Sequence, residues 1–373
     1  MLAAITDKGH EHLRQLSFTK AKELYGEQLP NNVSNRINFE LQIIEEREVS
    51  DFFLFLHEVV TVAQAHLGVW VGPGRGTAAS SLINYCLGIT KVDPLKYDLL
   101  FEQFIRPLDA LTPYVALDID LEGKESVMDW LRQKYGDPCD FLNGEFELYG
   151  LEALSIMRDA IEVIKASKGV SIDVEKIPID DTKTFELFQK GRTEEIFQFE
   201  TKEMRELLIE FHPTCLEELA ALNSLFQAHR TADIRMLIKR KNKKQPIRYP
   251  LPEVGKILDK TYGVIVYQEQ IMRIARLISN FTSDESDLLR RVVCKKRIAL
   301  IPTLKAQFME GGLENGHPRH NLKKTWDAIE RNAVFAFMKA HAVCYTWIAY
   351  QMAYLKANYP EEFKEVIEKY SLE

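Results

Sequence analysis

The chain has 373 residues, of which 46% are hydrophobic and 28% charged, and its formal net charge is −7. This length predicts two or three subdomains, and the composition is that of a globular protein with no run of 18 apolar residues to cross a membrane. The acidic balance argues against strong sequence-independent DNA binding by the whole surface, but it leaves room for a local basic groove. Five scattered cysteines without CxxC spacing argue against a zinc site and predict reduced thiols in a cytoplasmic protein.

Most of the chain has the periodicity of amphipathic helices, and the main exceptions lie between residues 68 and 150. Apolar residues recur at intervals of three and four in the helical parts, whereas alternation of acidic and apolar residues indicates a strand. In chain order, we expect helices over 11–66, a strand at 68–71, a glycine turn at 72–76, a buried helix within 80–89, a strand at 116–123, a helix over 126–136, a loop and short strand in 137–150, a helix over 151–169, and mostly helices from 180 onward with a strand-like piece at 261–268.

The turn GPGRG contains Gly72, Gly74, Arg75 and Gly76. A strand, a glycine turn and a helix in succession aim backbone N–H groups at an anion, and an arginine adds a bidentate phosphate contact. The spacing matches neither a Walker loop nor a dinucleotide-binding fingerprint. The residues therefore leave two interpretations open, a phosphate-binding turn and a tight structural turn.

A pair of aspartates in the predicted strand at 116–123 is a candidate metal site. Asp118 and Asp120 are two residues apart, which places both carboxylates on one face of a strand. Phosphoryl transfer with two metal ions requires such oxygen ligands on neighbouring strands. The alternative is two acidic residues on the solvated face of an edge strand.

Several stretches, taken in order, resemble the bacterial replicative DNA polymerase III alpha subunit, which belongs to the C family of DNA polymerases. GPGRG is followed by NYCLGITKVDPLKYDLLFEQF, and further similar stretches lie at 177–200, 262–275, 287–296 and 336–363. The resemblance implies an α+β fold: a palm with a small mixed sheet and the nucleotidyltransferase topology of polymerase beta, and largely helical fingers. It divides the chain into a helical N-terminal part of the palm at 1–66, the palm at 67–180 and the helical fingers at 181–373.

The family's metal-binding motif, Pro-Asp-x-Asp-x-Asp-Phe, can be placed on this chain in two registers. An alignment without a gap, which matches Pro107, Pro113 and Val127 to the family, puts Tyr114 and Ala116 at the two ligand positions. Asp118 is then aligned with the third aspartate, which is not a principal ligand. A two-residue shift makes Asp118 and Asp120 the ligands instead. We favour the ungapped register.

The third family carboxylate corresponds to Glu147, and Glu145 stands where the family has a lysine. Between Gly136 and Phe146 the family inserts a thumb of well over a hundred residues, whereas this chain has a short connection. The missing thumb would have gripped the duplex.

The resemblance also implies a set of nucleotide contacts in the palm and the fingers. For the basic pairs, a solvated helix end is the alternative interpretation, and for the histidine it is a structural role. The basic run 239–244 allows either contact with a nucleic-acid backbone or a solvated face, and we favour the latter. The implied nucleotide-binding residues are Gly72, Gly74, Arg75, Gly76, Ser81, Arg290, Arg291, Lys295, Lys296, Lys339 and His341.

Two functions are compatible with this pattern. The first is a catalytically impaired paralogue in DNA replication or repair, which keeps a scaffold for nucleotides or DNA, binds them weakly and has no membrane association. The second is an active DNA polymerase that uses Asp118, Asp120 and Glu147 with two Mg²⁺ ions. The ungapped register favours the first.

Overall fold

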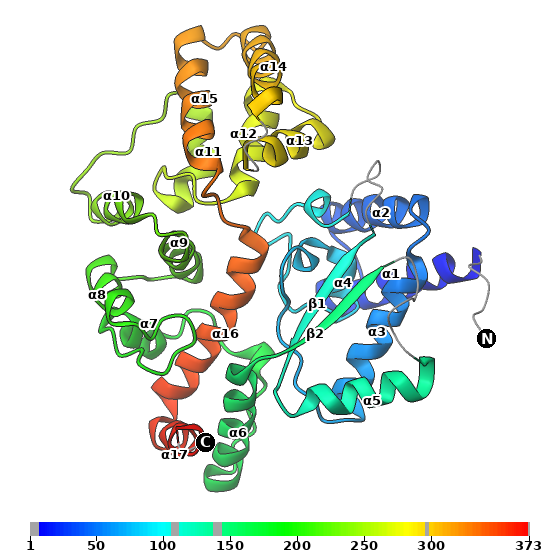
Figure 1. Ribbon diagram of the computed structural model, residues 1–373. Helices are drawn as coiled ribbons and strands as arrows, with labels where there is room; N and C mark the ends of the chain where they lie inside the picture. The colour runs from blue at the N-terminus through cyan, green and yellow to red at the C-terminus, as the bar shows by residue number, and fades with distance from the viewer. Residues whose placement is uncertain (1–6, 106–111, 137–143, 295–297, 372–373) are drawn as a thin grey trace. The chain divides into compact units, whose positions relative to one another are not determined.

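The computed structural model describes residues 7–105, 112–136, 144–294 and 298–371, and Figure 1 shows its helices and strands. The chain divides into two compact units: unit 1 contains 1–178 and 343–373, and unit 2 contains 179–342. No described helix is long and apolar enough to cross a membrane.

The elements of unit 1 are α1 (Asp7–Tyr25), α2 (Asn31–Glu46), α3 (Ser50–Ala65), α4 (Leu82–Cys86), β1 (Tyr114–Ile119), α5 (Gly123–Tyr135), β2 (Glu145–Gly150), α6 (Glu152–Lys168) and α17 (Pro360–Tyr370). Those of unit 2 are α7 (Thr182–Gln189), α8 (Lys202–Phe211), α9 (Leu216–Gln227), α10 (Thr231–Lys241), α11 (Gly255–Leu258), α12 (Gln268–Ser279), α13 (Ser283–Cys294), α14 (Ile301–Glu314) and α15 (Arg319–Ala333), and α16 (Lys339–Asn358) begins in unit 2 and continues in unit 1.

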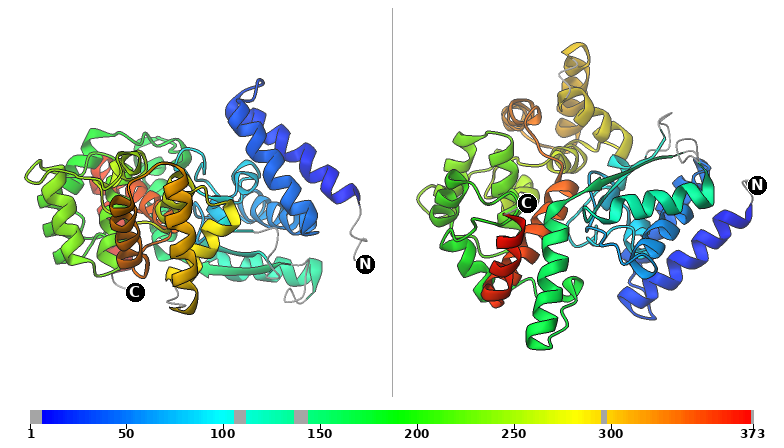
Figure 2. Two further views of the ribbon diagram at one scale, coloured as in Figure 1. Left: turned by 90° about the horizontal axis from the view of Figure 1, so that it is seen from above. Right: turned by 60° about the horizontal axis from the view of Figure 1, so that its bottom comes forward.

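Unit 1 is built around a parallel pair of strands, β1 and β2, in an otherwise helical surrounding (Figure 1). Its hydrophobic core joins residues of α2, α3 and α4 to those of β1 and α5. Five of the six β1 residues are buried, and burial of the apolar ones, Val115, Ala116, Leu117 and Ile119, stabilises the strand at about 25 cal/mol per Å². In the two further views, α6 and α17 lie side by side in the same unit (Figure 2). The predicted α+β class is confirmed.

The segment before the glycine turn pairs with β1 at a single position rather than as a strand. Val71 forms an antiparallel bridge with Ile119, and the N–H of Gly72 donates to the carbonyl of Asp118 over 2.8 Å. The pairing stops there because Gly74 and Gly76 have φ angles of +130° and +63°, a region that glycine adopts without a side-chain clash.

Predicted boundaries shift around both β1 and α4. The strand predicted at 116–123 extends over Tyr114–Ile119 instead, so Asp120 is not part of it. After the turn, a 3-10 helix at Ala78–Ser80 precedes α4, so the α-helix begins later than expected. Buried Glu40 explains the late start, because its carboxylate accepts from the N–H groups of Leu82 and Ile83 over 2.8 and 3.0 Å and thereby supplies partners for the first turn of α4.

Unit 2 is helical in its described residues, with a core that joins α12, α13, α14 and α15. The strand predicted at 261–268 is wrong: only Tyr267 forms an isolated bridge, to Phe337. Two features prevent a ladder there. Tyr262 and Gly263 have φ angles of +51° and +76°, and the side-chain oxygen of Gln270 accepts from the N–H groups of Val266 and Tyr267 over 2.8 and 3.0 Å.

Candidate functional site

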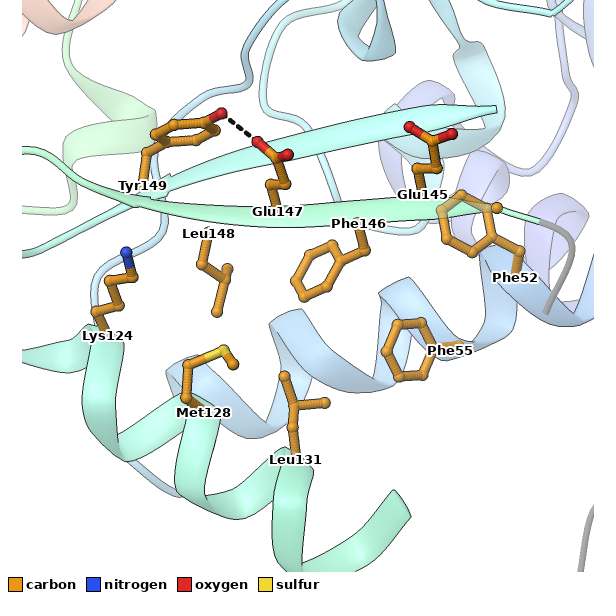
Figure 3. Close-up of a pocket in the computed structure, with 11 residues that line it drawn as sticks. Phe52, Phe55, Lys124, Met128, Leu131, Glu145, Phe146, Glu147, Leu148 and Tyr149 are labelled. Carbon is orange, nitrogen blue, oxygen red and sulfur yellow. Dashed lines mark hydrogen bonds between the residues drawn. The ribbon is translucent and has the colours of Figure 1, made fainter. Parts of the chain in front are cut away.

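The alternation of β1 and β2 separates a polar face from an apolar face. The parallel register pairs Tyr114 with Glu145, Ala116 with Glu147, and Asp118 with Tyr149, and these six residues share one face. Figure 3 shows the carboxylates of β2 on the opposite side of the strand from Phe146 and Leu148. The apolar side chains point towards α3 and α5 and line a groove of about 540 Å³. The polar face is therefore the place to look for chemistry.

Glu147 is held by two tyrosine hydroxyls. Tyr114 donates to its carboxylate over 2.8 Å, and Tyr149 donates to the same oxygen (Figure 3). Both hydrogen bonds favour the ionised carboxylate and lower the pKa of Glu147. Glu147 is exposed to solvent, so it presents a charged carboxylate at the surface of the sheet, with one oxygen already bonded to two tyrosines.

Asp118 is buried, with 1% of its surface exposed, and pairs with the arginine of the glycine turn. Arg75 Nη1 lies 2.9 Å from Asp118 Oδ1 and 2.6 Å from the hydroxyl of Tyr345, and its guanidinium lies 4.2 Å from the centre of the Tyr149 ring. The second carboxylate oxygen of Asp118 is buried without a hydrogen-bond partner among the described residues. Burial raises the pKa of Asp118 and outweighs the opposing effect of Arg75.

Asp120 lies just beyond β1 and fixes the backbone on either side. Its Oδ2 accepts from the N–H of Trp70 over 2.6 Å, and its Oδ1 accepts from the N–H of Gly123 over 2.8 Å. The Nη1 of Arg158 also donates to Oδ1, over 3.0 Å. Because both oxygens serve the start of α5 and the segment before the turn, the carboxylate has a structural role in this arrangement.

The three predicted carboxylates do not fit a magnesium site as they lie here. Each of the two aspartates is buried against an arginine, Ala116 is the β1 residue opposite Glu147, and the Tyr114 hydroxyl is bonded to the Glu147 carboxylate. No group of three or more histidine, cysteine, aspartate or glutamate side chains in the described parts of the chain lies close enough together to hold a metal ion. A hard divalent ion prefers several oxygen ligands at once, and the exposed carboxylates of this face, Glu145 and Glu147, both come from β2.

The predicted nucleotide contacts of the turn have partners inside unit 1. Gly72 approaches the backbone of Asp118 so closely that a Cβ atom would lie 3.2 Å from its carbonyl oxygen. Arg75 is the charged side chain of the turn, and 34% of it is exposed. Ser81 is fully buried, where its hydroxyl accepts from the N–H of Asn84 and donates to Glu40, so it serves to begin α4.

The predicted contacts of the fingers lie in unit 2, where the described ones are engaged by neighbouring groups. Arg290 and Arg291 form ion pairs with the buried carboxylate of Asp287. The backbone N–H of Lys339 donates to the buried carboxylate of Glu269 over 2.9 Å, and the His341 ring lies against that of Phe337. Lys295 and Lys296 lie outside the described residues.

Sequence reasoning missed the tyrosines and the second arginine of this site. Tyr345 lies in a run of aromatic residues whose helical spacing is typical of a buried core, and it is 7% exposed, but its hydroxyl bonds to Arg75, 270 positions away in the chain. Arg158, on α6, gave no local signal because its partner Asp120 is 38 residues away. An arginine on an otherwise amphipathic helix has no motif of its own.

A small parallel strand pair with a glycine turn beside it, in an otherwise helical chain, is the architecture of an α+β palm with helical fingers. Comparison with known families agrees: the model for the bacterial DNA polymerase III alpha NTPase domain matches residues 11–215, and that for the bacterial DNA polymerase III alpha subunit finger domain matches residues 153–316. The chain belongs to the bacterial DNA polymerase III alpha family.

Curated relatives match most of this chain but extend well beyond it. It is 26% identical to DNA polymerase III subunit alpha of Aquifex aeolicus (strain VF5), with 95% of this chain and 43% of the relative covered. It is 28% identical to DNA polymerase III subunit alpha of Staphylococcus aureus (strain COL), with 88% and 42% covered. The chain thus spans about two fifths of the length of these relatives.

Both alignments are longer than the part of this chain that they cover, so the relatives have additional residues within the aligned region. The alignments extend over 501 and 446 residues, whereas 95% and 88% of the 373 residues correspond to about 354 and 328. Each alignment therefore has more than a hundred positions at which this chain has no residue. That excess has the size of the insertion expected between Gly136 and Phe146.

Proposed function

We propose that this chain is a catalytically impaired member of the family, in DNA replication or repair, which keeps a scaffold with weak affinity for nucleotides and DNA. One observation carries the proposal: β1 presents Ala116 and Tyr114 to Glu147, and the tyrosine hydroxyl binds the carboxylate. This pairing favours the ungapped register, in which these two residues stand at the family's ligand positions. An alanine methyl and a tyrosine hydroxyl at neutral pH cannot replace two carboxylates around divalent ions.

The charge arrangement supports the same proposal. Two metal ions would bring positive charge to the strand pair. Here Arg75 supplies one positive charge to Asp118 from within the chain, and Tyr149 and Tyr345 hold its guanidinium. The buried carboxylate is thereby neutralised without a metal, which removes the electrostatic need for one.

We also infer that unit 1 is the palm and unit 2 the fingers. The predicted boundary at 180/181 lies close to the boundary between the units at 178/179. Residues 343–373, which we predicted to belong to the fingers, are grouped with unit 1. Tyr345 and Cys344 are contact residues of the glycine turn, so this segment contributes to the palm.

The second candidate function is an active polymerase, and one atom favours it. Among the described residues, the Oδ2 atom of Asp118 is buried without a hydrogen-bond partner, and such an atom is a natural place for an unseen ligand. In an active polymerase, both Asp118 and Asp120 would bind metal ions together with Glu147. Arg75 would then have to leave its ion pair with Asp118, and Asp120 would have to give up its hydrogen bonds to two backbone N–H groups.

Titration with Mn²⁺ distinguishes the two candidates. For the impaired protein we expect no site tighter than about millimolar, because the exposed carboxylates, Glu145 and Glu147, come from one strand and Glu147 is already held by two tyrosines, which makes a poor chelator of a hard cation. Isothermal titration calorimetry of the wild-type chain and of Glu147→Gln is the measurement. A micromolar site that disappears in Glu147→Gln, and also in Asp118→Asn, would establish the active polymerase.

Binding to a primed DNA template is expected to be weak and steeply dependent on salt. The chain is acidic overall, and its cations are local, as in the exposed Lys243 and Lys244 after α10. Such contacts release counterions from the DNA, so the logarithm of the binding constant falls with the logarithm of the salt concentration. The slope is about −0.9 for each phosphate neutralised. Fluorescence anisotropy between 25 and 200 mM salt tests this, with Lys243→Ala/Lys244→Ala expected to reduce the slope and Lys8→Ala as the control. Nanomolar binding that ignores salt would contradict the expectation.

A further inference from the structure

The basic run 239–244 is divided by the end of α10, and its members face different surroundings. Lys241 turns towards α9, where it pairs with the carboxylate of Glu218 and lies 4.6 Å from the centre of the Phe211 ring. Arg240, the residue before it, lines a cavity of about 380 Å³ within unit 2. The run is therefore neither one nucleic-acid surface nor one solvated face.

The cavity has an apolar floor with one aromatic ring in its wall. Val254, Leu258, Ile265 and Ile274 contribute buried aliphatic side chains. Tyr249 is half-buried at the wall, and its hydroxyl donates to Asp259 over 2.7 Å, which fixes the ring. Such a combination of apolar lining and a few oriented polar groups is typical of small-molecule sites, which span about 300–1,000 Å³.

The charged residues at this cavity leave an excess of positive charge. Its two acidic residues are already paired: Asp233 lies 2.8 Å from Arg230 Nε, and Asp327 lies 3.2 Å from Lys323 Nζ. Within the described parts of the chain, no carboxylate lies within ion-pair distance of the four cations of the lining. These four are Arg240, Arg248, Lys324 and Arg331.

Arg240 is the most constrained of the four. Its Nη1 donates to the carbonyl of Tyr262 over 2.9 Å, while its Nε–H is buried and has no partner among the described residues. A Cβ atom at Gly263 would lie 3.0 Å from Nη1, so the glycine leaves room for the guanidinium. Burial lowers the pKa of Arg240, and the nearby Tyr249 and Asp233 offset that effect only in part.

We propose that this cavity binds a nucleoside monophosphate, either free or as the phosphorylated end of a DNA strand. The phosphate oxygens accept from the guanidinium groups of Arg240, Arg248 and Arg331, since planar N–H donors match a phosphate group. The base lies on the apolar floor beside the Tyr249 ring. None of the residues that the family resemblance assigns to the nucleotide lines this cavity, so the site is separate from the glycine turn and does not depend on the proposed function.

Isothermal titration calorimetry of the whole chain with dAMP, in the absence of divalent metal, tests the proposal. We expect saturable binding of dAMP and at least about tenfold weaker binding of deoxyadenosine, which lacks the phosphate. Arg248→Ala and Arg331→Ala, both at exposed positions, should each raise the Kd for dAMP about tenfold. Arg240→Gln should raise it further, whereas Lys239→Ala, on the same helix but outside the cavity, should leave it within about twofold.

An eight-residue oligothymidylate with and without a 5′-phosphate separates the two sources of the ligand. Preference for the phosphorylated oligomer over dAMP assigns the site to a strand end, and the reverse preference assigns it to the free nucleotide. The proposal is overturned if neither dAMP nor the phosphorylated oligomer binds at millimolar concentration. It is equally overturned if the Kd is unchanged in both Arg248→Ala and Arg331→Ala.

Discussion

Purified chain supplied with a primed template, the four dNTPs and Mg²⁺ is expected to show no measurable primer extension. The reason is the proposed register, in which Tyr114 and Ala116 stand at the family's two ligand positions and no carboxylate of β1 lies opposite Glu147. Removing one preorganised electrostatic contact from a catalytic site costs about 10²–10³ in rate. Two such losses predict a rate about 10⁴–10⁶ below that of an intact site, even before the short connection after Gly136 is considered.

The measurement is single-nucleotide incorporation followed on a denaturing gel over hours, with an active family C polymerase as the positive control. A charge-restoring variant, Tyr114→Asp/Ala116→Asp, should gain affinity for Mn²⁺, because two carboxylates would then join Glu147. Its isosteric counterpart, Tyr114→Asn/Ala116→Asn, controls for the change in size and should gain none. Templated incorporation by the wild-type chain that is abolished in Asp118→Asn would show that the impaired assignment is wrong.

Replacing Arg75 by methionine should destabilise the chain by about 2–4 kcal/mol. The substitution keeps an apolar stem of similar length but leaves Asp118, 1% exposed, as a buried carboxylate without a cation. Breaking a buried ion pair from one side costs about 3–5 kcal/mol, and the partial exposure of the arginine reduces the expected loss. Urea unfolding followed by circular dichroism provides the free energy of unfolding.

The double variant Arg75→Met/Asp118→Asn is the matched control for this prediction. It removes the buried charge together with its partner, so we expect it to recover about half or more of the stability lost in the single variant. A single variant as stable as the wild type would mean that the ion pair contributes nothing to the fold. If the double variant were less stable than the single one, Asp118 would be needed for a reason other than its charge.

The pH dependence of the same variant has a defined sign. Burial raises the pKa of Asp118 in the folded chain, and loss of Arg75 should raise it further. Between the ordinary aspartate pKa of about 4 and the raised pKa of Asp118, the folded state holds a proton that the unfolded state has released. The stability of the chain is therefore highest below pH 4 and falls as the pH rises through this range. The deficit of Arg75→Met relative to wild type should therefore be small near pH 4 and largest near pH 7.

Local pattern alone predicted the helical elements and the family of this protein. The spacing of apolar residues located α5 and α6 within a few residues, because each helix buries one face and its periodicity is a local property. The glycine turn and the stretches after it were enough to indicate the family, since order and spacing along the chain carry that resemblance. Pattern failed at 261–268, where a β-branched run is interrupted by positive φ angles and a glutamine side chain takes the backbone donors.

The sequence by itself determined that Asp118 would lie on a strand and that Arg75 would lie in a turn, whereas Asp120, predicted on the same strand face, lies just beyond the end of β1. Only the tertiary structure decided that Arg75 forms an ion pair with Asp118 and a hydrogen bond with Tyr345. It also decided that Ala116, not an aspartate, lies opposite Glu147. The physical reason is that a strand's period fixes which side chains share a face, whereas the partners of that face come from segments 31 to 270 residues away. Their approach depends on packing of the whole unit, and packing leaves no local periodicity to recognise.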